Sequence, residues 1–156
     1  MARAFSRASS EYLTVSSAVK GSTPLTVAGW FYVLDTSLSH SLIEITQNGT
    51  NNEGFRLDAR STANVDIAAG ARASGAQSSA TTSTSYSQDT WFHACGVFAS
   101  STSRSAFLNG GGKGTSTVSR TPSGLDTTTI GAFMGSSVVN PLYGRAAECA
   151  VWGAAL

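Results

Sequence analysis

The chain has 156 residues, which is the length of one ordinary domain. Charged residues make up 12% of it, and the formal net charge is +1 with no basic or acidic block. Nucleic-acid binding needs clustered Lys and Arg, so this charge pattern argues against a nucleic-acid partner. No run is long and apolar enough for a membrane span or a secretory leader, so we expect neither membrane insertion nor a signal peptide.

The composition predicts an all-β fold. Hydrophobic residues make up 41%, and Ser and Thr supply about a quarter, beside 16 Gly and 3 Pro. Thr favours strands, whereas Ser and Gly favour turns and disfavour helix interiors. We therefore expect one all-β domain over residues 1–156.

Short alternating segments follow one another along the chain without a convincing helix. We expect strands at residues 11–15, 25–34, 42–46, 55–59, 65–69, 91–98, 104–108, 115–119, 127–133 and 143–152. Residues 25–34 are apolar on both faces, which predicts a central strand covered on both sides. Residues 55–59 alternate between apolar and charged side chains, which predicts a half-buried strand. About nine or ten short strands at this spacing predict an antiparallel sandwich or barrel.

Turn signals separate these strands. Asn109-Gly110 is the strongest hairpin signal, because both residues tolerate positive φ. The run GGGKGTS (residues 110–116) lacks a Ser or Thr directly after Gly-Lys and has no following helix, so we interpret it as a hairpin loop rather than a phosphate site. Residues 70–88 predict a mobile loop with one polar strand, at an edge.

Several longer motifs occur in order over nearly the whole chain. They are AFSRASSEYLTV, LTVAGWFYV, DTWFHACGVF, SAFLNGG, TTIGAF and LYGRAAECAVWGAAL. This series resembles the laminin-G-like members of the concanavalin A-like lectin/glucanase family, in particular stand-alone domains of the kind that bacteriophages encode. The resemblance implies an antiparallel β-sandwich, a jelly roll with one concave and one convex sheet.

Many members of that family hold calcium through carboxylates. Here Ser6-Arg7 and Ala99-Ser100 stand where the family has Asp-Gly, and the acidic residues are dispersed. No ligand set carries over, so we expect no metal site and no cofactor, with calcium left open by the resemblance alone.

Catalysis is not expected. Glycosidases of this fold place two carboxylates at alternate positions of one strand. No carboxylate in this chain has another two or four residues away; they are Glu11, Asp35, Glu44, Glu53, Asp58, Asp66, Asp89, Asp126 and Glu148. A pair assembled from different strands stays open.

The remaining chemistry-bearing side chains are interpreted as structural. We expect His93 to be a satisfied strand residue, His40 to be solvated in a Ser-rich turn, and Trp152 to fill the core. We expect Cys95 and Cys149 to be buried free thiols, although the sequence also permits a disulfide.

Sugar binding needs an aromatic platform together with amide or hydroxyl groups. The candidates in predicted loops are Asn51, Asn52, Phe133, Asn140 and Tyr143. The alternative is that Phe133 and Tyr143 pack beneath their loops.

Two functional hypotheses follow. The first is a non-catalytic display protein on the surface of a virion, with other virion proteins and cell-surface glycans as partners and a homo-oligomer left open. The family resemblance and the nearly uncharged, Ser/Thr-rich composition favour it. The alternative is an extracellular carbohydrate-binding module of a cell-surface or secreted adhesion protein.

Overall fold

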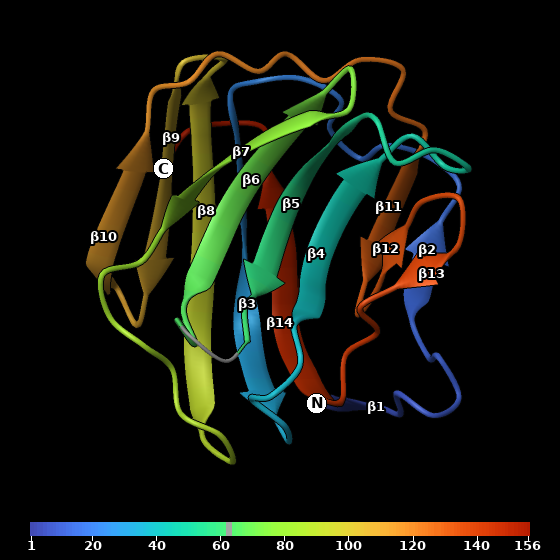
Figure 1. Cartoon of the computed structure of the whole chain (residues 1–156), viewed down its shortest axis with the longest axis vertical. Coiled ribbons are helices and arrows are strands. Elements are labelled where there is room, and N and C mark those ends of the chain that lie inside the picture. Colours follow the sequence, from blue (N-terminus) through green and yellow to red (C-terminus); the bar gives the residue numbers. More distant parts are fainter. Residues whose placement is uncertain (62–63) are drawn as a thin grey trace.

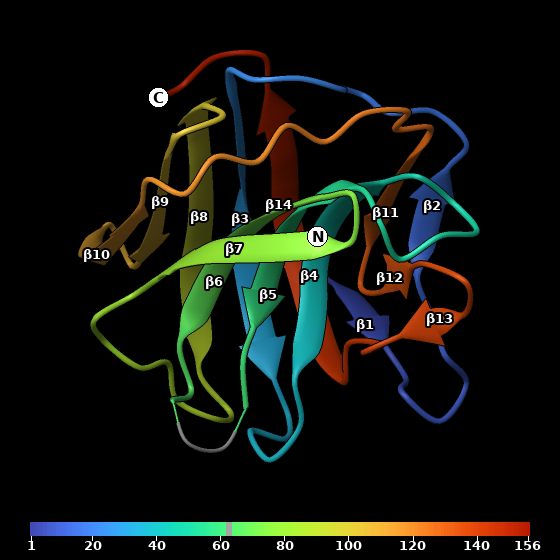
Figure 2. The same ribbon diagram turned by 45° about the horizontal axis from the view of Figure 1, so that its top comes forward.

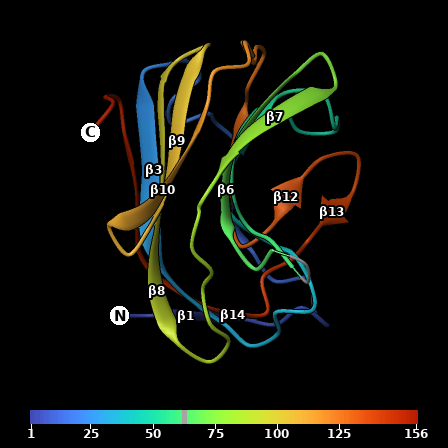
Figure 3. The same cartoon turned by 60° about the vertical axis from the view of Figure 1, so that its left-hand side comes forward.

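The computed structural model describes residues 1–61 and 64–156, and these residues form 14 strands and no helix. Two six-stranded antiparallel sheets face each other, which confirms the predicted antiparallel sandwich (Figures 1 and 3). Sheet A runs in the order β1 (Arg3–Phe5), β14 (Gly144–Trp152), β3 (Leu25–Val33), β8 (Trp91–Ser100), β9 (Ser103–Leu108) and β10 (Gly111–Ser116). No helix long and apolar enough to cross a membrane occurs in the described part of the chain.

Sheet B is the other layer. Its order is β2 (Leu13–Val15), β11 (Thr127–Ile130), β4 (His40–Thr46), β5 (Gly54–Ala59), β6 (Ile67–Ala73) and β7 (Ala76–Thr81). The sheet curves so that its outer face is concave (Figure 3). A small hairpin of β12 (Phe133–Met134) and β13 (Val138–Val139) lies beside β4 and β11 at one side of this concave face (Figures 1 and 2).

The core lies between the sheets and is built by strand alternation. On β3 the odd positions point inward, and Leu25, Phe31 and Val33 are completely buried. They meet inward residues of sheet B such as Leu57 and Ile45, which are also completely buried. Burying each such side chain contributes about 1.5–3 kcal/mol, so this alternation is the main determinant of the sandwich.

The other face of β3 differs from the prediction. The strand is central, between β14 and β8, but its outer face is not covered, because Trp30 is 41% exposed and Tyr32 is half-buried. Trp91, which neighbours Tyr32 on β8, is 37% exposed on the same face. The apolar residues of this face are aromatic rings that pack on one another across the strands rather than under a third layer.

Strand β5 is buried on both faces, so the prediction of a half-buried strand is wrong. Its charged residues Arg56 and Asp58 point to the concave face, where Arg56 pairs with Glu44 of β4 and lies against the ring of Phe133. Ion pairing and the covering hairpin remove these charges from solvent.

Residues 70–88 contain ordered strands, which corrects the predicted mobile loop. Strands β6 and β7 pair through a tight turn in which Ser74 and Gly75 have φ values of 49° and 79°. The expectation of a polar strand at an edge is confirmed, since β7 ends sheet B. The strands of this Ala- and Ser-rich stretch cannot be predicted from alternating hydrophobicity, because the alternation is too weak. Small residues occur here because neighbouring strands pack closely.

The Asn109-Gly110 turn is confirmed, with φ values of 52° and 71°. Because the turn is only two residues long, pairing resumes at once, and the glycine-rich run forms strand β10 rather than a loop. At Gly114 an added Cβ would lie 1.7 Å from the Thr81 carbonyl oxygen of β7. Glycine is therefore required where the edges of the two sheets meet.

A β-bulge in β14 reverses which side chains face the core. Before the bulge Ala146 points inward and is buried; the register then shifts between Ala147 and Ala150, and Val151 pairs with the inward Val27. Trp152 consequently faces outward and is 40% exposed, so its assignment to the core is wrong. One extra residue in a strand exchanges its two faces.

His40 is completely buried at the start of β4, which corrects the expected solvated turn. Its Nε2 lies 2.7 Å from the Asp35 carbonyl oxygen, and its Nδ1 lies 3.4 Å from the Tyr143 amide nitrogen. The segment that precedes β14 folds over the imidazole, a long-range contact that local sequence does not reveal.

Candidate functional site

The loop residues proposed from the sequence divide between the two ends of β4. Asn51 follows the C-terminal end of β4 and is hydrogen-bonded to the β12–β13 hairpin. Its Nδ2 donates to Ser136 Oγ at 3.1 Å, and its Oδ1 accepts from the Ser136 amide at 3.2 Å. The adjacent Asn52 is exposed, and its carbonyl accepts from the Gly75 amide at 3.1 Å.

The structure brings Phe133 to the same hairpin, but the ring is only 4% exposed. Its face is covered by the Arg56 guanidinium, whose Cζ lies 4.4 Å from the ring centroid. Phe133 therefore packs under its hairpin and presents no open platform.

Asn140 and Tyr143 lie at the opposite end of β4. The Asn140 carbonyl accepts from the Ser41 amide at 2.9 Å, and Tyr143 is 42% exposed beside His40. The five loop candidates thus do not form one site, and a sugar-binding role for them stays a prediction.

A charged cluster occupies the concave face of sheet B between these two groups. Arg56 Nε donates to Glu44 Oε2 at 3.0 Å, Nη2 to Asp58 Oδ1 at 3.4 Å, and Nη1 to Gln77 Oε1 at 3.2 Å. Ser41 Oγ donates to Asp58 Oδ1 at 3.1 Å. Each of the three Arg56 nitrogens thus donates one hydrogen bond within the cluster, and Phe133 lies over the guanidinium plane.

Two carboxylates from different strands meet in this cluster, which is the arrangement that the sequence left open. Glu44 is completely buried, and burial raises the pKa of its carboxyl well above the ordinary value. Arg56 opposes this rise, and the nearby Asp58 carboxylate adds to it. Because Glu44 is completely buried, the cluster is closed to a substrate and is not an open acid–base pair, although Glu44 Oε1 has no hydrogen-bond partner among the described residues.

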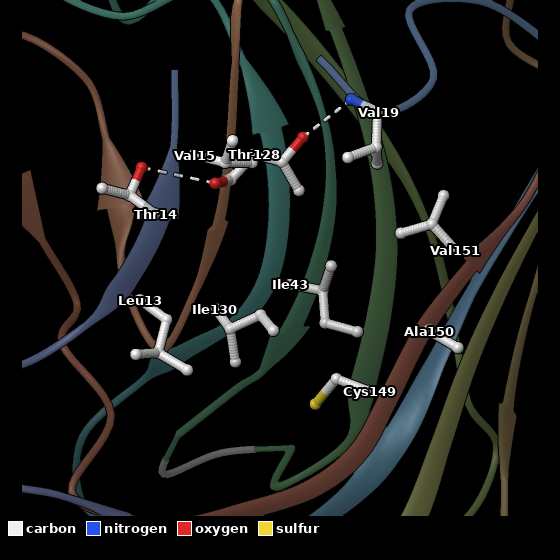
Figure 4. A pocket seen from close by; sticks show the side chains of 10 residues that line it. All are labelled: Leu13, Thr14, Val15, Val19, Ile43, Thr128, Ile130, Cys149, Ala150 and Val151. Carbon is white, nitrogen blue, oxygen red and sulfur yellow. Dashed lines mark hydrogen bonds between the residues drawn. The ribbon is translucent and has the colours of Figure 1, made fainter. Parts of the chain in front are cut away.

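A cavity of about 400 Å³ opens between the sheets, where β2 and β11 face β14 (Figure 4). Ile43, Ile130 and Val151 contribute hydrocarbon to its wall. Of its two threonines, Thr14 Oγ1 donates to the Thr128 carbonyl at 3.3 Å, and Thr128 Oγ1 donates to the Ser17 carbonyl at 3.0 Å. A sugar placed there would leave its hydroxyls without partners, which is costly.

Cys149 also points into this cavity (Figure 4). Burial raises the pKa of its thiol to about 11, so the group is neutral at physiological pH. Both cysteines are free thiols and half-buried, which agrees with the expected absence of a bond between them but corrects the expectation that they are fully buried.

The outer face of sheet A carries the most exposed aromatic surface. Trp30 and Trp91 line a hollow of about 270 Å³ together with Ala147 and Glu148. We call these four residues the tryptophan hollow. Both indole rings pack against neighbouring rings. The centroids of Trp30 and His93 lie 5.4 Å apart and those of Trp91 and Tyr32 lie 5.7 Å apart, each pair edge to face.

Glu148 reaches this surface because of the β14 bulge. It has a φ of 52° and is exposed, whereas simple alternation from the buried Ala146 would direct it into the core. Within the described residues its carboxylate has neither an ion pair nor a hydrogen bond. The hollow therefore combines two indole rings with one negative charge that has no partner among the described residues.

Sequence reasoning missed Trp30, Trp91 and Glu148 as site residues. The available signal was that β3 is apolar at both odd and even positions, which was interpreted as burial on both faces. An exposed aromatic face produces the same pattern, and the bulge that places Glu148 has no signature in the residues that form it.

No group of three or more His, Cys, Asp or Glu side chains gathers as a metal site in the part of the chain that the structure describes. Near Ser6-Arg7 the structure places the single carboxylate of Glu11, whose Oε2 accepts from the Ser6 amide at 2.7 Å, and Ala99-Ser100 themselves carry no carboxylate. These residues do not fit a calcium ion.

Comparison with known structures finds the same fold in several proteins, two of which are solved with a bound sugar. Domain 4 of the arabinanase AbnA from Geobacillus stearothermophilus, in complex with arabinotriose, matches with a TM-score of 0.76 and 14% identity over 93% of this chain and 68% of that one. The carbohydrate-binding module of the Ruminococcus gnavus IT-sialidase, bound to sialyllactose, matches with a TM-score of 0.72 and 16% identity over 94% and 91%. Domains LG4-5 of the mouse laminin α1 chain match with a TM-score of 0.70 and 12% identity over 95% of this chain and 39% of that one.

A sequence comparison with curated proteins finds no match. The family model described as the concanavalin A-like lectin/glucanases superfamily matches residues 7–156. This match covers almost the entire sandwich, including both sheets and the tryptophan hollow, and agrees with the strand order and the structural neighbours. The chain belongs to the concanavalin A-like lectin/glucanase superfamily, as a laminin-G-like domain.

Proposed function

We propose that this chain is a non-catalytic glycan-binding module whose contact surface is the tryptophan hollow. The observation that carries the proposal is the pair of indoles, Trp30 and Trp91, left 41% and 37% exposed beside the unpaired carboxylate of Glu148. Indole faces pack against the C–H faces of sugar rings, and a carboxylate accepts hydrogen bonds from sugar hydroxyls. Strands hold these groups more rigidly than loops would.

The structural neighbours support this proposal through their ligands. The G. stearothermophilus domain is solved with arabinotriose and the R. gnavus module with sialyllactose, and the arabinanase is described as extracellular. We accordingly propose that the present chain meets its glycan outside a cell.

The absence of catalysis is part of the proposal. It is supported by the closed state of the carboxylate pair Glu44 and Asp58, both of which Arg56 engages. The check is release of reducing ends from a panel of polysaccharides. Turnover by the wild-type chain that Glu44→Gln abolishes would contradict a binding-only role.

Binding is tested with an immobilised glycan array, followed by calorimetry on each hit. Trp30→Ala and Trp91→Ala are each expected to weaken binding by about tenfold or more, since each removes a stacking surface. Trp152→Ala is the matched control, because Trp152 is an exposed tryptophan of the same face that does not line the hollow. Equal losses in all three variants, or none in any, would refute the assignment of the site.

Metal independence is the expected result in the same assay. Since no carboxylate cluster within residues 1–61 and 64–156 could hold calcium, binding in EDTA should equal binding in calcium. Loss of binding in EDTA would show that a calcium site had been overlooked.

The second candidate function is display on the surface of a virus particle, where the same domain would adhere to cell-surface glycans. The low charge and the Ser/Thr-rich composition favour it, and many copies on one particle, or a homo-oligomer, would raise avidity without any new contact. Mass spectrometry of purified particles from the source decides it, because absence of the chain from them removes this role.

A further inference from the structure

The wall of the tryptophan hollow carries a charge that glycan stacking alone does not require. Glu148 is exposed and has neither an ion pair nor a hydrogen bond among the described residues, although it is next to two indole rings. The nearby cation of the same strand, Arg145, does not line the hollow; its Cζ lies 5.2 Å from the ring centroid of Tyr32, which in turn packs on Trp91. The four residues that line the hollow therefore carry a net negative charge.

We propose that the tryptophan hollow recognises an amino sugar with a free, protonated amine, whose ammonium group lies between the indole faces and the Glu148 carboxylate. This inference rests on the proposed glycan-binding function and names the ligand class of that site. Three properties of the hollow support it: the first two distinguish amino sugars from neutral and acidic sugars, and the third defines the pair of ligands that tests the inference.

The first property is the pair of indole faces. An ammonium over the face of Trp gains about 0.5–1 kcal/mol at an exposed site and about 2 kcal/mol where water is excluded. Trp30 and Trp91 are both partly buried, so the free energy gained by an ammonium in the hollow should lie between these two values. A neutral sugar gains stacking here but not this electrostatic attraction.

The second property is the carboxylate. An ammonium donates charge-assisted hydrogen bonds to Glu148, and these are about twice as strong as neutral ones. A uronic or sialic acid would instead bring a second carboxylate toward Glu148, which is unfavourable. The charge of Glu148 thus selects against acidic sugars and for basic ones.

The third property is the small size of the fourth wall residue. Ala147 lies across from Trp30 in the β14–β3 register and adds only a methyl group to the wall, so Glu148 is the one polar side chain among the four residues that line the hollow. An N-acetylated sugar stacks in this hollow equally well, but its amide carries no charge for Glu148. Free and acetylated amines are therefore the pair of ligands that separates charge recognition from stacking.

The test measures binding of β-1,4-linked glucosamine hexamer and of its fully N-acetylated counterpart by calorimetry at physiological ionic strength. We expect the wild-type chain to bind the free-amine hexamer about five- to tenfold more tightly. Glu148→Gln keeps the size and backbone demands of the side chain and removes its charge. This variant should bind both hexamers with similar affinity, and thermal unfolding confirms that it folds.

The possible outcomes distinguish failure of the amino-sugar assignment from failure of the proposed glycan-binding function. Equal or tighter binding of the acetylated hexamer by the wild type, or an unchanged amine preference in Glu148→Gln, overturns the amino-sugar assignment. Failure of both hexamers, with Trp30-dependent binding of another glycan, overturns the assignment and leaves glycan binding intact. Absence of any Trp30-dependent glycan overturns both.

Discussion

Trp30 and His93 face each other across β3 and β8, with the indole and imidazole rings edge to face at a centroid distance of 5.4 Å. This contact fixes the orientation of one wall of the tryptophan hollow. A large side chain on an exposed sheet face otherwise loses rotamer freedom when a ligand binds. Neighbouring rings on the sheet reduce that loss before the ligand arrives.

Removing the imidazole should therefore weaken glycan binding without unfolding the domain. We expect His93→Ala to lower the affinity for the glycan about two- to tenfold, because an aromatic pair contributes about 0.5–1.5 kcal/mol. His93→Phe should retain most of the affinity. Calorimetry gives the affinities, and thermal unfolding of each variant shows whether the fold is unchanged. A loss in His93→Phe equal to that in His93→Ala would mean that the imidazole acts through hydrogen bonding instead.

The Arg56 network should be essential to stability. Arg56→Leu leaves Glu44 and Asp58 buried without their cation, and removing one partner of a buried ion pair costs about 3–5 kcal/mol. Arg145→Leu is the control, since Arg145 is exposed and stacks on Tyr32 without a carboxylate partner in the described structure; it should cost less than about 1 kcal/mol. Urea unfolding gives both values. Similar costs for the two variants would show that the cluster is solvated.

Glu44 should make the domain less stable as the pH rises. Burial, reinforced by Asp58, raises the pKa of this carboxyl in the folded state above its ordinary value of 4.5. The folded state therefore favours the protonated form, so this contribution to stability is complete below pH 4.5 and is lost as the pH rises through the raised pKa.

Glu44→Gln cannot titrate and isolates this effect. Between about pH 5 and pH 8, the free energy of unfolding should fall more steeply in the wild type than in Glu44→Gln. Chemical unfolding of both proteins across this range measures the difference. Parallel profiles would mean that Arg56 keeps Glu44 ionised throughout.

The contact between β10 and β7 should tolerate no side chain at Gly114. An added Cβ would lie 1.7 Å from the Thr81 carbonyl oxygen, so Gly114→Ala must move backbone and should cost about 1–3 kcal/mol or more. Gly111→Ala in the same strand is the control, because its nearest neighbour is the Leu108 oxygen at 3.9 Å. Thermal unfolding compares them, and a Gly111 variant as unstable as the Gly114 variant would point to backbone entropy instead of the clash.

The fold was predictable where one local rule decides the outcome. Alternation placed β3 and the inward face of β5, and Asn109-Gly110 placed the β9–β10 turn. The resemblance to the family then predicted how these strands are arranged, as two facing sheets. The buried state of His40 depends on a segment about one hundred residues away, so no window of sequence contains it.

The candidate site was harder to predict, for a related reason. Whether Trp30 is covered depends on the absence of a third layer, and the inward side of β14 depends on a bulge between Ala147 and Ala150. Periodicity identifies two faces of a strand but does not say which of two apolar faces meets solvent. Both missed features concern the relation of a strand to its surroundings.

That bulge makes the chemistry of the outer face depend on a residue count rather than on residue identity. Deleting one residue between Ala147 and Ala150 would restore simple alternation: Val151 and Trp152 would keep their partners on β3 and their faces, whereas Glu148 would be either lost or turned toward the interior, away from Trp30 and Trp91. Loss of a single codon in frame would thus remove the Glu148 carboxylate from the tryptophan hollow and leave the other strands in register. Insertions and deletions in this short stretch offer related domains a direct evolutionary route to gain or lose this ligand preference.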